Sequence, residues 1–380
     1  AQAGRIRWER VPVIAVQEDF TNGKTAWFSD GRLSACPTIL DGSRADDNAA
    51  KPALLFFDSA GEKRSYSYHA LDGEVRKLAA ALRERGLRSG DRVALYLPDS
   101  PETIFFTLAC ASLGLIAVPI PIRYTAELTR EILLDSGAAL LAVAFGSGSQ
   151  SYETRVRAVL EASQDMLLIN AGIKAADGTI SYEEFVSPFA LNPLETFEIV
   201  DSEHPLFILY ANSAAGVPRG SVFATAGFLV QAAASFDYLF TSGVGGDETG
   251  SMVCTLELAS AAGQCYGIWG PFLNGVCAVI SAEGMRTISE RLREVLDNCP
   301  SPSLLTSPVM ISALKRELNG EDLSGRRFVL AASSGDTLKP RHIRFAARTL
   351  VSSPERMLNL WVQTECGASL INTFPSPELN

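Results

Sequence analysis

The strongest constraint on the fold is a regular alternation of amphipathic helices and short apolar strands through the middle of the chain. One helix face is formed by apolar residues spaced three or four positions apart: Leu71, Val75, Leu78 and Leu82. Gly86 follows, and glycine is typical of the left-handed position that ends a helix. The alternation then predicts strands at 92–97, 116–120 and 140–145, with helices at 101–113 and 126–136 between them.

Helices placed between short, continuously apolar strands require crossover connections, which produce a mostly parallel sheet. After a less regular region at 171–201 the pattern resumes. Strands are predicted at 206–210, 276–281, 328–332 and 357–361, with helices at 224–240, 289–298, 308–318 and 340–351. We therefore predict an α/β fold of two stacked, mostly parallel subdomains with helices on both faces, divided into 1–200 and 201–380.

Charge and cysteine usage exclude several classes of protein. The 33 Lys and Arg are outnumbered by 43 Asp and Glu, giving a net charge of −10, which argues against a nucleic-acid-binding surface. The seven cysteines form no C-x-x-C pair and there are three histidines, so a structural zinc site is not expected. No apolar run is long enough to span a membrane and no leader sequence is evident. We expect a cytoplasmic protein with no membrane or nucleic-acid partner.

One loop that follows a predicted strand is suited to phosphate binding. The segment 206–220 (LFILYANSAAGVPRG) runs from an apolar strand into a loop with two glycines, a proline and Arg219. Ligands of open α/β sheets bind at the carboxyl ends of strands. Backbone N–H groups of such a loop can point at phosphate oxygens, and Arg219 can add a charge-assisted bond. Taken alone, the same residues also form a common turn.

The segment resembles the phosphate loop T-S-G-[ST]-T-G-x-P-K-G of the AMP-forming acyl-CoA synthetases and adenylation domains. Five other stretches resemble the acetyl- and propionyl-CoA synthetase branch of that family, in the same order: 27–33 (WFSDGRL), 66–72 (YSYHALD), 90–98 (GDRVALYLP), 266–275 (YGIWGPFLNG) and 361–367 (WVQTECG). The resemblance covers most of 27–375. It implies the N-terminal domain fold of the adenylate-forming enzymes, without their β-barrel subdomain and C-terminal domain.

The resemblance also implies a two-step reaction and a set of site residues. A carboxylate attacks the α-phosphate of ATP in the presence of Mg²⁺, and the acyl group then passes to the thiol of CoA or of a carrier protein's phosphopantetheine. The implied catalytic residues are Thr364, which binds the α-phosphate, Glu365, which ligates Mg²⁺, and Arg219. The implied nucleotide contacts are Asn212, Ser213, Gly216, Gly220, Gly335, Asp336, Thr337, Trp361 and Gln363. A polar strand end without a role is the alternative for residues 363–365.

The phosphate loop departs from the family pattern. Three hydroxyl positions of the pattern are alanines here, Ala211, Ala214 and Ala215, while Ser213 replaces a glycine and Arg219 replaces the lysine. Each missing hydroxyl removes a possible hydrogen bond to a charged phosphate, a loss of about 1–3 kcal/mol. The sequence therefore predicts a degenerate phosphate loop in which backbone N–H groups and Arg219 compensate only in part.

The acid pocket implied by the resemblance is also altered. Val362 stands where the acetate-using branch has a tryptophan, and the other pocket positions are the small residues Ala261, Ala262 and Ser334. A smaller side chain leaves more space, so we expect an acid larger than acetate. The alternative is that these small residues are simply a repacked core.

Together these features predict an acyl-adenylate-forming ligase domain, an enzyme that activates a carboxylic acid for transfer to CoA or an acyl carrier protein. A starter-loading domain of a polyketide or peptide assembly line is one form of it. The alternative is an inactive adenylation-fold pseudoenzyme that serves as a scaffold, partner-binding or acyl-binding module. The family continues beyond the position of Asn380 with a ribose-binding aspartate and an adenylation lysine, so we expect this chain alone to be an incomplete enzyme. Cys265 and Cys366 are expected to be structural thiols.

Overall fold

The computed structural model describes residues 6–40, 50–147, 149–163, 165–211, 218–241, 250–282, 286–323 and 325–373. The chain forms two compact units, the first from Ala1–Lys51 and Tyr66–Val230 and the second from Pro52–Ser65 and Gln231–Asn380. These units differ from a division at residue 200, because the second unit takes in an early segment and begins after Val230. A division into domains at residue 200 stays a prediction.

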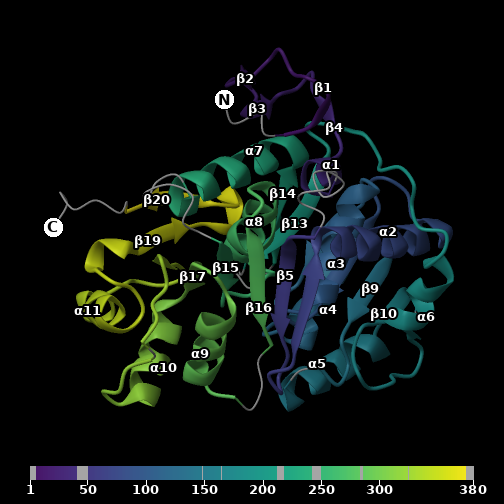
Figure 1. Cartoon of the computed structure of the whole chain (residues 1–380). Coiled ribbons are helices and arrows are strands. Elements are labelled where there is room, and N and C mark those ends of the chain that lie inside the picture. The colour runs from purple at the N-terminus through teal and green to yellow at the C-terminus, as the bar shows by residue number, and fades with distance from the viewer. Residues whose placement is uncertain are drawn as a thin grey trace. The chain divides into compact units, whose positions relative to one another are not determined.

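The first unit is built on a seven-stranded sheet of order β11-β10-β9-β7-β8-β13-β14. Figure 1 labels its strands β9, β10, β13 and β14. Its strands are β7 (Arg92–Tyr96), β8 (Ile116–Pro119), β9 (Leu140–Val143), β10 (Leu167–Asn170), β11 (Ile180–Ser181), β13 (Pro205–Ala211) and β14 (Arg219–Ala224). All neighbouring strands are parallel except β13 and β14, which form an antiparallel pair at the edge. Its helices are α1 (Ala35–Leu40), α2 (Tyr68–Glu84), α3 (Pro101–Ser112), α4 (Ala126–Ser136), α5 (Gln150–Glu161) and α6 (Tyr182–Val186), followed by the 3₁₀ turn η3 (Ser187–Phe189).

Two small sheets complete the first unit. One has the order β1-β4-β12 and the other pairs β2 with β3. Their strands are β1 (Trp8–Arg10), β2 (Val16–Asp19), β3 (Lys24–Trp27), β4 (Arg32–Leu33) and β12 (Val200–Asp201).

The second unit is built on an eight-stranded sheet of order β20-β19-β18-β17-β15-β16-β5-β6. Its strands are β5 (Pro52–Phe57), β6 (Lys63–Ser67), β15 (Ser251–Cys254), β16 (Cys277–Ser281), β17 (Pro302–Thr306), β18 (Ala331–Ser333), β19 (Met357–Val362) and β20 (Ser369–Asn372). The six strands from β19 to β5 are parallel, and β20 pairs antiparallel with β19. The α/β class and the mostly parallel sheets are therefore confirmed.

Helices cover both faces of the second sheet. The helical elements are η4 (Asp237–Thr241) and η6 (Gly263–Trp269), both π-helical, α8 (Gly270–Leu273), α9 (Ile288–Asn298), α10 (Pro308–Leu318), α11 (Pro340–Thr349) and the 3₁₀ turns η7 (Pro354–Arg356) and η8 (Thr364–Cys366). Helix α7 (Thr225–Phe236) crosses the boundary between the two units. Helices α9, α10 and α11 share one hydrophobic core with the strands, while η6 contacts β15 and β16 and α8 contacts β16.

The predicted α2 helix illustrates why these elements form. Leu71, Val75, Leu78 and Leu82 are all fully buried. The side chain of Ser67 accepts a hydrogen bond from the N–H of Ala70, which satisfies a free donor at the N-terminus. After the helix, Gly86 has a φ of +86°, the left-handed conformation that glycine adopts without steric cost. The apolar spacing, the Ser67 cap and the Gly86 stop signal therefore all indicate the same helix.

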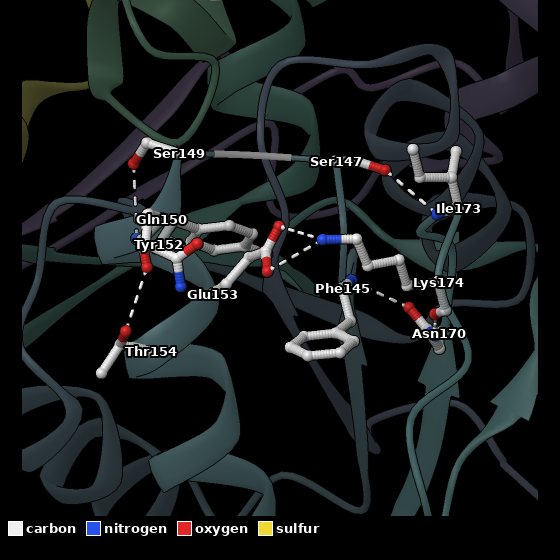
Figure 2. A network of polar contacts seen from close by, with 10 residues as sticks. All are labelled: Phe145, Ser147, Ser149, Gln150, Tyr152, Glu153, Thr154, Asn170, Ile173 and Lys174. Carbon is white, nitrogen blue, oxygen red and sulfur yellow. Dashed lines mark hydrogen bonds and ion pairs between the residues drawn. The ribbon is translucent and has the colours of Figure 1, made fainter.

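A polar network closes the carboxyl edge of the first sheet at β9 and β10 (Figure 2). The Oδ1 atom of Asn170 accepts hydrogen bonds from the N–H groups of Phe145 and Gly172, each at 2.9 Å. Its Nδ2 atom donates to the carbonyl of Lys174 at 2.8 Å, and the Nζ of Lys174 pairs with Glu153 of α5 at 3.1 Å. These groups satisfy one another and hold the two loops in place.

No helix in the described ranges has both the length and the apolar character needed to cross a membrane.

Candidate functional site

The carboxyl ends of four parallel strands in the second unit meet at one edge of the sheet. Strands β15, β17, β18 and β19 are successive neighbours, with Cys254 opposite Leu305, Thr306 opposite Ser333, and Ser333 opposite Asn359. The segments that follow these strands therefore leave the sheet at the same edge, which is where ligands of open α/β sheets bind. Two of the predicted groups, 334–337 and 363–365, follow adjacent strands there.

Hydrogen bonds between the ends of β15, β17 and β18 hold this edge of the sheet in place. The Oγ1 of Thr255 lies 3.0 Å from the Oγ1 of Thr306 and 3.1 Å from the carbonyl of Leu305. The N–H of Ser334 donates to the carbonyl of Thr306 at 3.0 Å, which continues the β17–β18 pairing by one residue. The start of the loop after β18 is therefore held rigidly.

The loop after β18 carries four of the predicted residues. Ser334 is buried, and Gly335 has a φ of +96°, a conformation that side-chain-bearing residues rarely adopt. This turn brings the chain to the surface, where Asp336 and Thr337 are exposed. The N–H of Thr337 donates to Oδ1 of Asp336 at 2.6 Å. The loop thus presents a carboxylate and a hydroxyl at the edge.

The segment after β19 carries the predicted Gln363, Thr364 and Glu365. The N–H groups of Cys366 and Gly367 both donate to the carbonyl of Gln363 at 3.2 Å, which closes the short turn η8. Gly367 ends that turn with a φ of +72°. Thr364 is half-buried and Glu365 is exposed. A compact turn therefore holds both side chains immediately beyond the strand.

Trp361 lies one residue before the end of β19. It is paired with Ile371 of β20, and 52% of its surface is exposed. Val362 is half-buried at the end of the same strand.

The two predicted pocket residues Ala261 and Ala262 directly precede η6, and both are buried. The next turns of this element are anchored by Gln264, whose Nε2 donates to the carbonyl of Leu258 at 2.8 Å. The hydroxyl of Tyr266 accepts a hydrogen bond from the N–H of Ser369 at 3.0 Å, so η6 lies beside the start of β20. A pocket formed by these alanines with Ser334 and Val362 stays a prediction.

The remaining predicted residues belong to the first unit. Arg219 is exposed at the start of β14, opposite Ala211, and Gly220 is opposite Tyr210. The predicted residues Asn212, Ser213 and Gly216, together with Ala214 and Ala215, lie outside the described residues. A Cβ atom on Gly220 would lie 2.8 Å from Cγ2 of Ile208, so close packing across the strand pair requires glycine here. Its predicted role in nucleotide binding is untested.

Three polar residues at the edge of the second sheet were not predicted: Thr255, Thr306 and Ser333. Ser333 is fully buried, and its Oγ has no hydrogen-bond partner among the described residues. Buried hydroxyls normally have a partner, so this one calls for a water or a ligand. Two short apolar runs, which end at Cys254 and Thr306, could have indicated strands whose ends carry these residues. Runs this short are easily overlooked as strands.

The thiol of Cys265 is a poor nucleophile. Burial raises its pKa to about 12, the hydrogen bond from Ser235 opposing this. Cys366 is half-buried in η8. The reactive form of cysteine is the thiolate, so the environment of Cys265 supports a structural role.

The edge residues fit Mg²⁺ bound together with a phosphate ligand. Mg²⁺ prefers oxygen donors and is commonly held by one or two carboxylates plus substrate phosphates and water. Glu365 and Asp336 supply exposed carboxylates, and the part of the chain that the structure describes holds no cluster of three or more His, Cys, Asp or Glu suited to a metal on its own. A metal here would depend on its phosphate partner.

Comparison with known proteins gives a consistent result. A family model described as "AMP-binding enzyme" matches residues 43–380. The acetyl-coenzyme A synthetases of Mycobacterium bovis and Streptomyces coelicolor are 29% and 27% identical, each covering 98% of this chain. This chain spans 59% of the length of either one.

Solved structures agree on the fold. The crystal structure of a Brucella canis acyl-CoA synthetase superposes with a TM-score of 0.74 at 19% identity, covering 90% of this chain and 59% of that one. With two α/β units, a polar edge where parallel strands end and a family match over most of its length, the chain belongs to the AMP-binding enzyme family.

Proposed function

We propose that this chain is the nucleotide- and acid-binding part of an adenylate-forming ligase that activates a carboxylic acid larger than acetate. The observation that carries the proposal is the convergence of residues 334–337 and 363–365 at the carboxyl ends of the adjacent strands β18 and β19. Family membership supports the reaction class, and the acetyl-coenzyme A synthetase relatives support the acyl-CoA branch of it.

In this proposal the nucleotide lies along the edge of the second sheet. Trp361 offers an exposed ring to the adenine, and Gly335, Asp336 and Thr337 run along the base's edge. Thr364 donates its hydroxyl to the α-phosphate, and Gln363 contributes the polar side chain next to it. The proposed contacts of the outer phosphates are those that the resemblance implies: Arg219, Asn212, Ser213, Gly216 and Gly220.

The first step requires positioning and charge neutralisation more than proton transfer, because carboxylates are ionised at neutral pH. Glu365 would hold Mg²⁺, which when bound neutralises phosphate charge as pyrophosphate leaves. Thr364 keeps the α-phosphate in place for attack. The hydrogen bonds of η8 fix the backbone that carries both residues, which limits reorganisation of that turn during the reaction.

The size of the acid follows from four side chains. Val362 is smaller than the tryptophan of the acetate-using branch, and Ala261, Ala262 and Ser334 are small and buried. If these residues line the acid pocket, it has more room than a pocket closed by tryptophan. The activated acyl group would pass to the thiol of CoA or of a phosphopantetheine-bearing carrier protein. With a carrier protein as acceptor, the chain would load the starter acid of a polyketide assembly line.

A second candidate function is an inactive adenylation-fold module that binds a partner or an acyl group. Alanines at 211, 214 and 215 favour it, because each removes a hydroxyl that the family's loop uses for phosphate. Both candidates share the fold and differ in nucleotide turnover.

ATP–pyrophosphate exchange with a panel of carboxylic acids from acetate to octanoate, measured on the full-length gene product, tests the proposal. We expect exchange with a medium-chain acid to exceed exchange with acetate, and Glu365→Gln to lower it about ten- to a hundredfold through weakened metal binding. Glu131→Gln, an exposed glutamate on α4, is the charge-matched control and should keep the full rate.

Because this chain spans only part of its relatives' length, exchange is measured on the full-length gene product, and nucleotide binding is measured by calorimetry on the 380-residue chain. Nucleotide binding without exchange would support the nucleotide site and contradict the ligase reaction. Absence of both exchange and nucleotide binding would overturn the ligase proposal in favour of the inactive module.

A further inference from the structure

A groove between α10 and α11 in the second unit is lined by cations. Its volume is about 550 Å³, within the range of small-molecule sites. The cationic lining residues are Lys315, Arg341, Arg344 and Arg348. Phe345, which packs against the core of the unit, adds an apolar wall. This groove is lined by none of the residues assigned to the nucleotide or the acid.

The three arginines of α11 lie on one face of the helix. Arg341, Arg344 and Arg348 are spaced three and four residues apart, and all are exposed. Like charges at this spacing destabilise a helix by a few tenths of a kcal/mol per pair. The row spans roughly 10 Å along the helix axis, at about 1.5 Å per residue. The arrangement is unfavourable for the helix unless something compensates it.

The protein supplies little compensation of its own. Within the described ranges, Lys315 and the three arginines form no ion pair with a carboxylate. Two carboxylates line the groove, Glu321 and Asp322. Because Asp322 pairs with Arg327 at 2.8 Å, Glu321 is the lining carboxylate that remains to offset the four cations. The chain as a whole carries a net charge of −10, so this concentration of positive charge is local.

The pKa of the neighbouring His342 responds to the same positive charges. It is buried in α11 between Arg341 and Ile343, and its Nδ1 accepts a hydrogen bond from the N–H of Lys339 at 3.2 Å. Burial lowers the pKa of His342, and the positive charges of Arg341, Lys339 and Lys315 lower it further, while Asp336 acts in the opposite direction. An anion bound in the groove would reverse part of that effect.

We propose that the groove between α10 and α11 binds a small molecule bearing several phosphate groups, at a site separate from the proposed nucleotide site. Arginine and lysine recognise phosphate through charge-assisted hydrogen bonds. A single phosphate meets only part of a cationic row of this length, so a ligand with two or more linked phosphates fits better. Phe345 gives an organic portion of the ligand a surface to pack against.

Calorimetry with inorganic tripolyphosphate at 0.15 M salt tests the site, with orthophosphate as the single-phosphate comparison. We expect tripolyphosphate to bind at least about tenfold more tightly than orthophosphate, and Arg344→Gln to weaken it about tenfold, the loss of one charged hydrogen bond. Arg316→Gln is the matched control, because Arg316 is exposed on α10 and does not line the groove. It should stay within about twofold, since Arg316 makes no direct contact with a ligand in the groove.

The proton NMR titration of His342 locates the binding. The chain has three histidines, so the His342 resonance can be assigned by comparison with His342→Asn. Tripolyphosphate should raise the pKa of His342 in the native chain and not in Arg344→Gln, whose ATP binding by calorimetry should be unchanged. Binding that leaves the His342 titration unmoved, equal losses in Arg344→Gln and Arg316→Gln, or no binding at millimolar tripolyphosphate would each overturn the proposal.

Discussion

At the residue scale, Gly220 shows that a position assigned to a ligand also has a packing role. Its missing side chain makes room for Ile208 and Tyr210 on the facing strand. The hydroxyl of Tyr210 is in turn fixed by a 2.6 Å bond to Asp135, so its ring has little freedom to move aside. A glycine here is required by the β13–β14 pair whether or not a phosphate binds.

We predict that Gly220→Ala lowers the free energy of unfolding by about 1–3 kcal/mol, the usual cost of overpacking. Gly73→Ala is the control: Gly73 lies in α2, and a Cβ there meets no atom within 4 Å. It should stabilise the chain by about 0.5–1 kcal/mol, because alanine is the better helix former. Urea unfolding followed by circular dichroism measures both. Equal effects of the two alanines would show that the β13–β14 packing is looser than described.

Most of the residues at the candidate site were predicted, but through resemblance to a family. Thr364, Glu365 and Asp336 have ordinary residue types, and neither spacing nor composition distinguishes them from a polar strand end. Thr255 and Ser333 were missed because a hydroxyl becomes informative only when its neighbours are known. Ser333 stands out through the absence of a described hydrogen-bond partner, which is a property of the folded chain.

At the element scale, sequence pattern located the amphipathic helices well and the short strands less well. The predicted bounds of 126–136 and 308–318 coincide with α4 and α10, because capping residues and apolar spacing agree at both ends. Strands β15 and β17 have four or five residues and were not predicted. The strand predicted at 328–332 begins at Ala331 instead, since Phe328 is a core residue whose backbone precedes the sheet.

The turn η8 gives a prediction at this scale. Gly367 has a φ of +72° and donates its N–H to Gln363, so it closes the turn that carries Thr364 and Glu365. Gly367→Ala should lower the free energy of unfolding by about 1–2 kcal/mol, the cost of a left-handed alanine. Exchange activity should fall further than stability alone explains, because Glu365 is displaced.

Gly367→Asn is the matching variant, since asparagine tolerates the left-handed region better than alanine. It should recover much of the stability and activity lost in Gly367→Ala. Urea unfolding and ATP–pyrophosphate exchange are measured on both. If alanine and asparagine behave alike, the left-handed conformation at residue 367 is not what holds the turn.

At the scale of the whole molecule, each unit has a hydrophobic core of its own. In the first unit the core includes Leu141 of β9, and in the second it includes Leu304 of β17. Both leucines are almost completely buried in parallel strands. A chain of two compact units with separate cores departs from two-state unfolding, and each unit can lose its structure in a separate step.

We therefore predict that matched core truncations act on one unit at a time. Leu304→Ala should cost about 2–5 kcal/mol and deprotect amides of β15, β17 and β18, while those of β7 and β9 keep their protection. Leu141→Ala should give the reverse pattern. Hydrogen exchange with mass spectrometry in mild urea, where partial unfolding is sampled, distinguishes the two sets of peptides. Loss of protection in both units from either substitution would show that the molecule unfolds as one cooperative body, in spite of its separate cores.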